Sequence, residues 1–208
     1  TNGKENPGNL TLSIEANLDM NNLLWTPTVV DGYNGVDIVT ILGNNNKITG
    51  LTAPLFEGGF AGESGIVIKD LTIANSNIVS LNNQGSGAFI ESVDSMEQIT
   101  LINCHLINSK VSGSRTGGLI GWTSGYDNVN DGSVKTYITI KECSIINSEI
   151  KGEGSVGGII GHAGANAWTY HLIENCNIKD NKLIAVDEGD LRVGSIIGTA
   201  NVGEVVIN

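Results

Sequence analysis

Short runs in which apolar and polar residues alternate, separated by clusters of Gly, Asn and Ser, make up most of this chain. The segment from Leu10 to Met20 alternates almost strictly, which predicts one strand with its apolar side chains on a single face. Residues 37–51 predict the first clear coil, in which Val39 and Ile41 point to one side and residues 43–46 turn the chain. No segment has the apolar period of about 3.6 residues that marks a helix, so the pattern predicts short strands throughout.

One pattern of residues recurs along the chain. Residues 138–161 read ITIKECSIINSEIKGEGSVGGIIG, and residues 99–121 read ITLINCHLINSKVSGSRTGGLIG. Copies start near residues 38, 66, 99, 138, 171 and 205, and the copies that start at 66, 99, 138 and 171 are 33, 39 and 33 residues apart. A unit of this size cannot bury its own apolar face, so the copies are expected to stack on one another.

The stacked copies predict an all-β fold, a right-handed single-stranded parallel β-helix (a solenoid) of roughly six coils. A β-propeller is the main alternative, but its blades are about 40–50 residues long and consist of antiparallel strands. The expected organisation is a polar N-terminal tail over residues 1–9 and a single β-helix domain over residues 10–208. Residues 54–58 are expected to stack against the later Gly-Gly-x-Ile-Gly segments.

Aligning the copies places similar side chains at the same repeat position, where they would stack at the strand spacing of about 4.8 Å. Four such positions hold Leu71, Cys104, Cys143 and Cys176; Ile73, Leu106, Ile145 and Ile178; Asn75, Asn108, Asn147 and Asp180; and Ile78, Val111, Ile150 and Leu183. A further position aligns residues 88–90 with residues 118–120, 158–160 and 195–197. Like residues therefore lie on like residues along the predicted stack.

The residues at these repeated positions are expected to have structural roles and not catalytic or ligand-binding ones. A Cys where the neighbouring copy has Leu predicts a buried core residue, and its spacing along the stack favours neither a disulfide nor a tetrahedral metal site. We therefore expect three free, unreactive thiols. The Asn position predicts a ladder of buried amides that satisfy one another, with polar ligands for a metal or sugar as the alternative. Gly117-Gly118 and Gly157-Gly158 predict positive φ or a close backbone approach.

Composition narrows the classes of function. Of the 208 residues 40% are hydrophobic and 16% are charged, and the net charge is -11. The chain is too apolar for a disordered protein, and its negative charge opposes binding to nucleic acid and to anionic lipid. No apolar run reaches about 18 residues, so we expect no membrane insertion of this domain. Residues 1–8 show no export signal and are typical of the polar start of a trimmed mature domain.

A short motif links the chain to a known family. Residues 118–121 (GLIG) fit the GLUG motif, Gly-Leu-hydrophobic-Gly, of bacterial surface proteins. Looser versions and similar N-terminal segments lie at residues 158–161, 195–198, 16–20, 25–27 and 43–51. From about Leu10 to its end the chain thus resembles GLUG-motif-containing, adhesin-like β-helix proteins. The resemblance implies an exported scaffold, and some members are attached to zinc-type immunoglobulin A peptidases. This sequence has no H-E-x-x-H motif, so we do not expect that activity here.

The loops that follow the Gly-Gly-x-Ile-Gly segments hold a large share of the aromatic residues. Because these loops follow neighbouring copies, we expect them to meet at one corner of the stack. Exposed rings there would suit sugar faces or protein hot spots, whereas rings that cover strand edges would be structural. The expected ligand-binding residues are Trp122, Tyr126, His162, Trp168 and Tyr170.

Metal binding and catalysis have less support in the sequence. Residues 127–132 (DNVNDG) are similar to a calcium loop, but Val129 stands where an oxygen ligand is needed. A glycosidase needs two carboxylates at a defined separation, and the carboxylates here are scattered. A polysaccharide lyase needs a basic residue beside clustered acidic residues, and neither Arg115 nor Arg192 adjoins such a cluster in sequence. Asp187, Glu188 and Asp190 are expected to form a solvent-exposed acidic loop. No catalytic residue, metal site or cofactor is predicted.

The sequence therefore predicts a non-catalytic cell-surface β-helix protein, structural or adhesin-like, whose loops bind a host surface protein or a glycan. The alternative is a carbohydrate-binding or polysaccharide-processing module, since β-helices include such enzymes but a fold does not give a function. We expect an extracellular or bacterial cell-surface location and a monomer, with no nucleic-acid partner.

Overall fold

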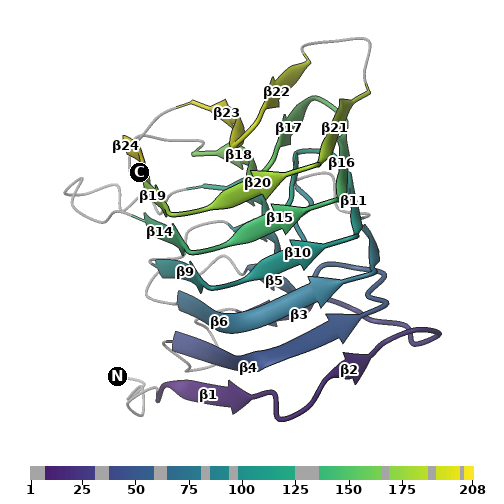
Figure 1. Ribbon diagram of the computed structural model, residues 1–208. Coiled ribbons are helices and arrows are strands. Elements are labelled where there is room, and N and C mark those ends of the chain that lie inside the picture. The colour runs from purple at the N-terminus through teal and green to yellow at the C-terminus, as the bar shows by residue number, and fades with distance from the viewer. Residues whose placement is uncertain are drawn as a thin grey trace, which may run out of the picture.

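The computed structural model describes residues 8–30, 38–58, 65–80, 85–93, 98–124, 136–164, 169–186, 191–201 and 204–208. Its described part consists of strands with no helix, and these strands stack in chain order from one end of the molecule to the other (Figure 1). Every strand pairing within it is parallel. The parallel stacking confirms the predicted all-β, solenoid-like architecture. No helix that could span a membrane occurs among these residues.

The strands form four sheets, which are the sides of the stack. The eleven-stranded sheet holds β1 (Leu10–Ser13), β2 (Leu18–Asp19), β4 (Ile38–Thr49), β6 (Gly65–Ala74), β9 (Gln98–Ile102), β10 (His105–Ile107), β14 (Thr136–Lys141), β15 (Ser144–Ile146), β19 (Thr169–Glu174), β20 (Asn177–Lys179) and β24 (Glu204–Ile207). The four-stranded sheet holds β7 (Asn77–Val79), β11 (Lys110–Gly113), β16 (Glu149–Gly152) and β21 (Lys182–Ala185). The three-stranded sheet holds β12 (Thr116–Gly117), β17 (Ser155–Gly157) and β22 (Arg192–Gly194). The six-stranded sheet holds β3 (Thr28–Val30), β5 (Phe56–Gly58), β8 (Ile90–Val93), β13 (Ile120–Thr123), β18 (Ile160–Ala163) and β23 (Ile197–Ala200).

The predicted apolar positions form the core. Leu106 pairs with Ile73 on one side and Ile145 on the other, and Val111 pairs with Ile78 and Ile150 in the same way. All of these side chains are buried and belong to one hydrophobic cluster. Residues 54–58 stack as predicted, since the N–H of Leu55 donates to the carbonyl of Ala88 and Phe56 pairs with Ile90.

Two bends in each repeated coil place a non-glycine residue in the left-handed conformation. Their φ values lie between 49° and 58°, at Asp70, Asn103, Glu142 and Asn175 for the first bend and at Asn75, Asn108, Asn147 and Asp180 for the second. Asn and Asp tolerate this conformation because their short polar side chains can bond locally. The repeated Asn therefore sets the corners of the coil.

The sequence predicts a ladder of buried asparagines, and the predicted burial is wrong. Asn108 and Asn147 are exposed, although the amide of Asn147 does donate to Asn108 Oδ1 at 2.7 Å. The buried ladder is made by the serine that follows each Asn, where the N–H of Ser76 donates to Ser109 Oγ at 3.1 Å and the N–H of Ser109 donates to Ser148 Oγ at 3.2 Å. At this bend the left-handed Asn side chain is exposed to solvent, whereas the next side chain is buried.

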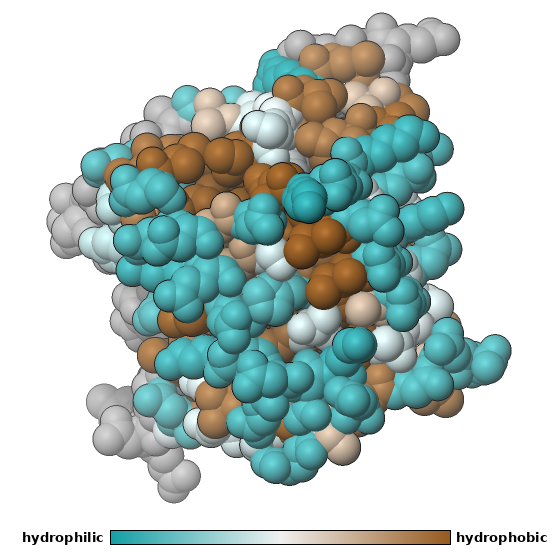
Figure 2. All heavy atoms as spheres, viewed as in Figure 1, coloured by the Kyte–Doolittle hydropathy of each residue, from teal (hydrophilic) through white to brown (hydrophobic). Residues whose placement is uncertain are grey.

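The N-terminal segment, predicted as one strand with a single apolar face, also differs from its prediction. The segment from Leu10 to Met20 forms two short strands, β1 and β2, both of which pair with β4. Leu10, Leu12 and Leu18 remain 42%, 48% and 42% exposed. Within the described residues this coil has a neighbour on one side only, so its apolar residues lie at an end of the stack. Exposed apolar residues also mark the last coil, and Figure 2 shows hydrophobic surface near that end.

The paired glycines are needed because another part of the backbone lies close to them, and not because their φ is positive. Among the described residues the glycines at positive φ are Gly50, Gly154 and Gly164. A Cβ added at Gly118 would overlap the carbonyl oxygen of Gly158, and one added at Gly158 would overlap that of Ser195. These glycines therefore let successive coils stack closely at the turn between the three-stranded and six-stranded sheets.

Candidate ligand-binding surface

Two of the five residues predicted to bind a ligand are direct neighbours. Trp122 on β13 pairs in register with His162 on β18, and the same row continues to Ser92 on β8 and Thr199 on β23. Partners on adjacent parallel strands lie about 4.8 Å apart. The prediction that successive repeats bring these positions together is thus confirmed for Trp122 and His162.

Arg115 lies beside this row and contacts Trp122. Its guanidinium carbon lies 5.8 Å from the centre of the Trp122 ring, a cation–π distance. Stacking on an indole holds the planar guanidinium in one orientation, and the fork of a guanidinium matches the geometry of a carboxylate. Repeat alignment does not connect these two residues, because Arg115 precedes β12 and Trp122 lies on β13, in another sheet.

His162 is buried and electrically neutral. It is 8% exposed, and its Nε2 lies 3.1 Å from Nδ2 of Asn201. Nδ1 is buried and has no hydrogen-bond partner in the part of the chain that the structure describes. Burial lowers the pKa of His162 to about 4, with smaller contributions from Arg115 and Arg192. At neutral pH this imidazole is an uncharged hydrogen-bonding group.

The remaining predicted residues have different outcomes. Tyr170 lies on β19 in the eleven-stranded sheet and pairs with Tyr137, their ring centroids being 6.0 Å apart. The next residue, His171, is fully buried, and its Nε2 lies 3.0 Å from the hydroxyl of Thr123, which follows Trp122. Tyr126 and Trp168 lie outside the described residues, as do the calcium-like segment 127–132 and the acidic segment 187–190.

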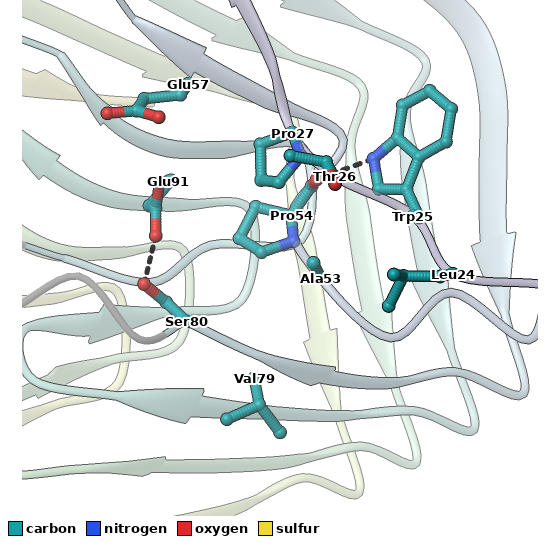
Figure 3. A pocket seen from close by; sticks show the side chains of 10 residues that line it. All are labelled: Leu24, Trp25, Thr26, Pro27, Ala53, Pro54, Glu57, Val79, Ser80 and Glu91. Atoms are coloured by element: carbon teal, nitrogen blue, oxygen red, sulfur yellow. Dashed lines mark hydrogen bonds between the residues drawn. The ribbon is translucent and has the colours of Figure 1, made fainter.

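A separate pocket, missed by the sequence reasoning, lies nearer the N-terminal end. It has a volume of about 380 Å³ and is lined by Leu24, Trp25, Thr26, Pro27, Ala53, Pro54, Glu57, Val79, Ser80 and Glu91 (Figure 3). The indole N–H of Trp25 donates to the carbonyl of Pro54 at 2.9 Å, which fixes the orientation of the ring. The lining is mostly apolar apart from two carboxylates and two hydroxyl groups.

The two carboxylates of this pocket come from neighbouring strands. Phe56 pairs with Ile90, which places the following residues, Glu57 and Glu91, side by side on β5 and β8. Glu91 is 4% exposed and accepts a hydrogen bond from Ser80, toward which its carboxylate points in Figure 3. In the next coil the equivalent position is Gly121, so a glutamate in place of the last GLUG glycine was the available sequence signal.

The cysteine position forms a stack of free thiols. Cys104 and Cys143 are buried and Cys176 is partly buried, and the N–H of Cys104 donates to the sulfur of Cys143 at 3.4 Å. Hydrogen bonding with Cys104, together with burial, raises the pKa of Cys143 to about 12, and Cys143 likewise raises the pKa of Cys176. Within the described residues no group of three His, Cys, Asp or Glu side chains could hold a metal ion.

Comparison with known proteins supports the fold. The chain matches no established family profile, and no curated protein matches it. It is similar to the crystal structure described as "a putative immunoglobulin A1 protease from Bacteroides ovatus", with a TM-score of 0.60 and 18% sequence identity. The match covers 98% of this chain and 72% of the other. At this identity the likeness shows the fold alone.

Proposed function

We propose that this chain is a non-catalytic β-helix protein of the cell surface, structural or adhesin-like, that binds a glycan or a host surface protein. In this proposal the solenoid is right-handed, has roughly six coils and acts as a monomer outside the cell. The observation that carries the binding role is the pairing of Trp122 with His162 beside Arg115. Trp122 and His162 lie near the ends of β13 and β18.

A rigid stack that presents aromatic and polar groups at one corner suits recognition more than catalysis. Loops on a rigid scaffold are common binding sites, and Trp and Arg are the residue types most enriched at binding hot spots. Trp122 is only partly buried, so part of its ring remains available for contact. A sugar ring could use the indole edge while Arg115 and the neighbouring hydroxyl groups bond its polar substituents.

A glycan array, together with a screen of host surface proteins, tests this proposal. We expect selective binding that is lost in Trp122→Ala and kept in Trp25→Ala, a matched tryptophan change in the pocket of Figure 3. Loss of binding in Trp25→Ala alone would place the ligand in that pocket. Absence of selective binding in both screens would overturn the binding role and leave a spacer.

The pocket gives specific support to the alternative, a polysaccharide-processing module. Glu57 and Glu91 follow the paired residues Phe56 and Ile90 on adjacent strands, and glycosidases use two carboxyl groups that flank the scissile bond. The contact between Glu91 and Ser80 weighs against a free catalytic pair. Incubation with a panel of polysaccharides and with immunoglobulin A1 decides between the two readings. We expect no cleavage, whereas polysaccharide cleavage abolished by Glu57→Gln would favour the alternative, and immunoglobulin A1 cleavage would refute a non-catalytic role.

A further inference from the structure

The two arginines of this chain occupy the same repeat position. Arg115 and Arg192 are the only arginines among 208 residues, in a chain of net charge -11. Ser155 pairs with Arg192, and Thr116 pairs with Val156, so Arg115, Ser155 and Arg192 lie in one row across the three-stranded sheet. Two strand spacings of about 4.8 Å separate the arginine backbones, a distance that two long side chains can close.

This arginine row faces the row of Trp122, His162 and Thr199 on the six-stranded sheet. The guanidinium of Arg115 lies over the Trp122 ring at 5.8 Å, and the hydroxyls of Ser155 and Thr199 are 2.7 Å apart. We name these six residues the arginine strip: Arg115, Ser155, Arg192, Trp122, His162 and Thr199. Ser155, His162 and Thr199 are each only 7–8% exposed and make its floor.

The floor of the strip contains an unused hydrogen-bond donor. The amide of Asn201 donates to Nε2 of His162, which leaves the proton of the neutral ring on Nδ1. That N–H is buried without a partner among the described residues. A buried donor without an acceptor costs about 1–3 kcal/mol, so an acceptor at this place would be favoured.

Both arginines act on the same imidazole. Arg115 and Arg192 each lower the pKa of His162 through their positive charge, after the larger effect of burial. Each arginine also interacts with other groups of the chain. A guanidinium has five N–H donors in a fixed fork, enough to hold such a contact and a ligand at once.

We propose that the arginine strip binds the carboxylate of an acidic sugar at the end of an otherwise neutral glycan, between Arg115 and Arg192. The proposal rests on the glycan-binding function proposed above and names its ligand class. Arg–carboxylate pairs are often bidentate. Below them, His162 adds one neutral donor, and the hydroxyl pair of Ser155 and Thr199 adds another, because one of its two O–H groups already donates to the other. The overall negative charge of the chain repels polyanions, so a single terminal carboxylate fits better than a long sulfated polymer.

Calorimetric titration with sialyllactose and lactose, which differ by one carboxylate-bearing sugar, tests the proposal on the whole chain. We expect sialyllactose to bind at least about tenfold more tightly than lactose, and Arg115→Gln and Arg192→Gln each to remove about tenfold of that affinity. Arg115→Lys keeps the charge without the planar fork and should fall between. Lys110→Gln, which removes one exposed positive charge on β11, is the matched control and should bind like the original chain.

Each outcome has a distinct meaning once thermal unfolding shows that the variants are folded. Equal binding of both sugars would overturn the acidic-sugar inference and leave the glycan-binding function standing. A preference for sialyllactose that Lys110→Gln reduces as much as Arg115→Gln would overturn the assignment to the strip. Failure of both sugars to bind would overturn the inference, and failure on the glycan array as well would remove the glycan-binding function.

Discussion

The hydroxyl oxygen of Ser109 accepts a hydrogen bond from the backbone N–H of Ser76, one coil away, at 3.1 Å. The same hydroxyl donates to the carbonyl of Ile107 at 2.8 Å. Ser109→Ala would leave the N–H of Ser76 buried without this acceptor, so we expect the free energy of unfolding to fall by about 1–3 kcal/mol. Urea denaturation followed by circular dichroism measures the change.

Ser112→Ala is the matched control for that measurement. Ser112 lies half-buried on β11 of the same coil, outside the serine ladder. A surface change of this kind is expected to stay within about 0.5 kcal/mol. Equal losses in Ser109→Ala and Ser112→Ala would show that the ladder adds nothing beyond ordinary packing.

Glu142 occupies a bend at which the equivalent residues are Asp70, Asn103 and Asn175. Its φ of 56° costs a residue without a local bonding side chain about 1–2 kcal/mol. We expect Glu142→Asn to stabilise the protein by up to about 1 kcal/mol, seen as a higher melting temperature. Glu153→Asn removes the same charge from an exposed position without positive φ. A gain of the same size in Glu153→Asn would assign the effect to charge and not to backbone conformation.

The apolar register was predictable from the sequence, but contacts between different sides of the coil were not. Ile73, Leu106 and Ile145 repeat at one position, and stacked parallel strands must then place them together. The serine ladder was missed because the burial of Asn108 or of Ser109 depends on a positive φ that residue identity suggests but does not fix.

In the candidate site too, contacts within one repeat position were predictable and contacts between different repeat positions were not. Trp122 and His162 belong to one repeat position, so their pairing followed from alignment of the copies. The stacking of Arg115 on Trp122 depends on how closely two sheets approach, and so does the contact of Ser80 with Glu91. Alignment of the repeats does not give the distance between two sheets, so it could not predict these contacts.

Gly158 is expected to be among the least replaceable residues of the stack. A Cβ there would overlap the carbonyl oxygen of Ser195 and approach Cδ1 of Ile178 at 3.3 Å. Gly158→Ala should therefore lower the free energy of unfolding by about 1–3 kcal/mol or more, measured by urea denaturation. Gly154→Ala meets open space and only the cost of a φ of 89°, so it should lose less. The opposite ranking would contradict the close stacking of successive coils at Gly158.

The stack of thiols should resist modification while the protein is folded. Cys104 and Cys143 are buried, and a pKa of about 12 keeps Cys143 protonated at ordinary pH, whereas the reactive species is the thiolate. A thiol reagent at pH 8 should therefore modify these two residues only after denaturant is added, with Cys176 slow. Rapid modification of Cys143 in the folded protein, identified by peptide mass, would contradict its placement in the core.

His171 is expected to make stability depend on pH. It takes the core position that Ile66, Ile99 and Ile138 fill in the preceding coils, and burial lowers its pKa to about 4. An unfolded histidine has a pKa of about 6.5, so between pH 6.5 and 4 the unfolded chain binds more protons than the folded one. Stability therefore falls as the pH drops through this window, by up to roughly 3 kcal/mol for this group.

His171→Ile should remove this contribution and fit the core position. The hydroxyl of Thr123 keeps its bond from the N–H of Gly164 at 3.1 Å, so the change leaves it with a partner. Urea midpoints at pH 7, 6, 5 and 4 should decline less steeply in His171→Ile than in the original chain, with the remaining slope due in part to His162. His105→Gln, a change at a half-buried histidine on β10, should alter the slope less. An unchanged slope in His171→Ile would mean that the pKa of His171 is the same in the folded and unfolded chain.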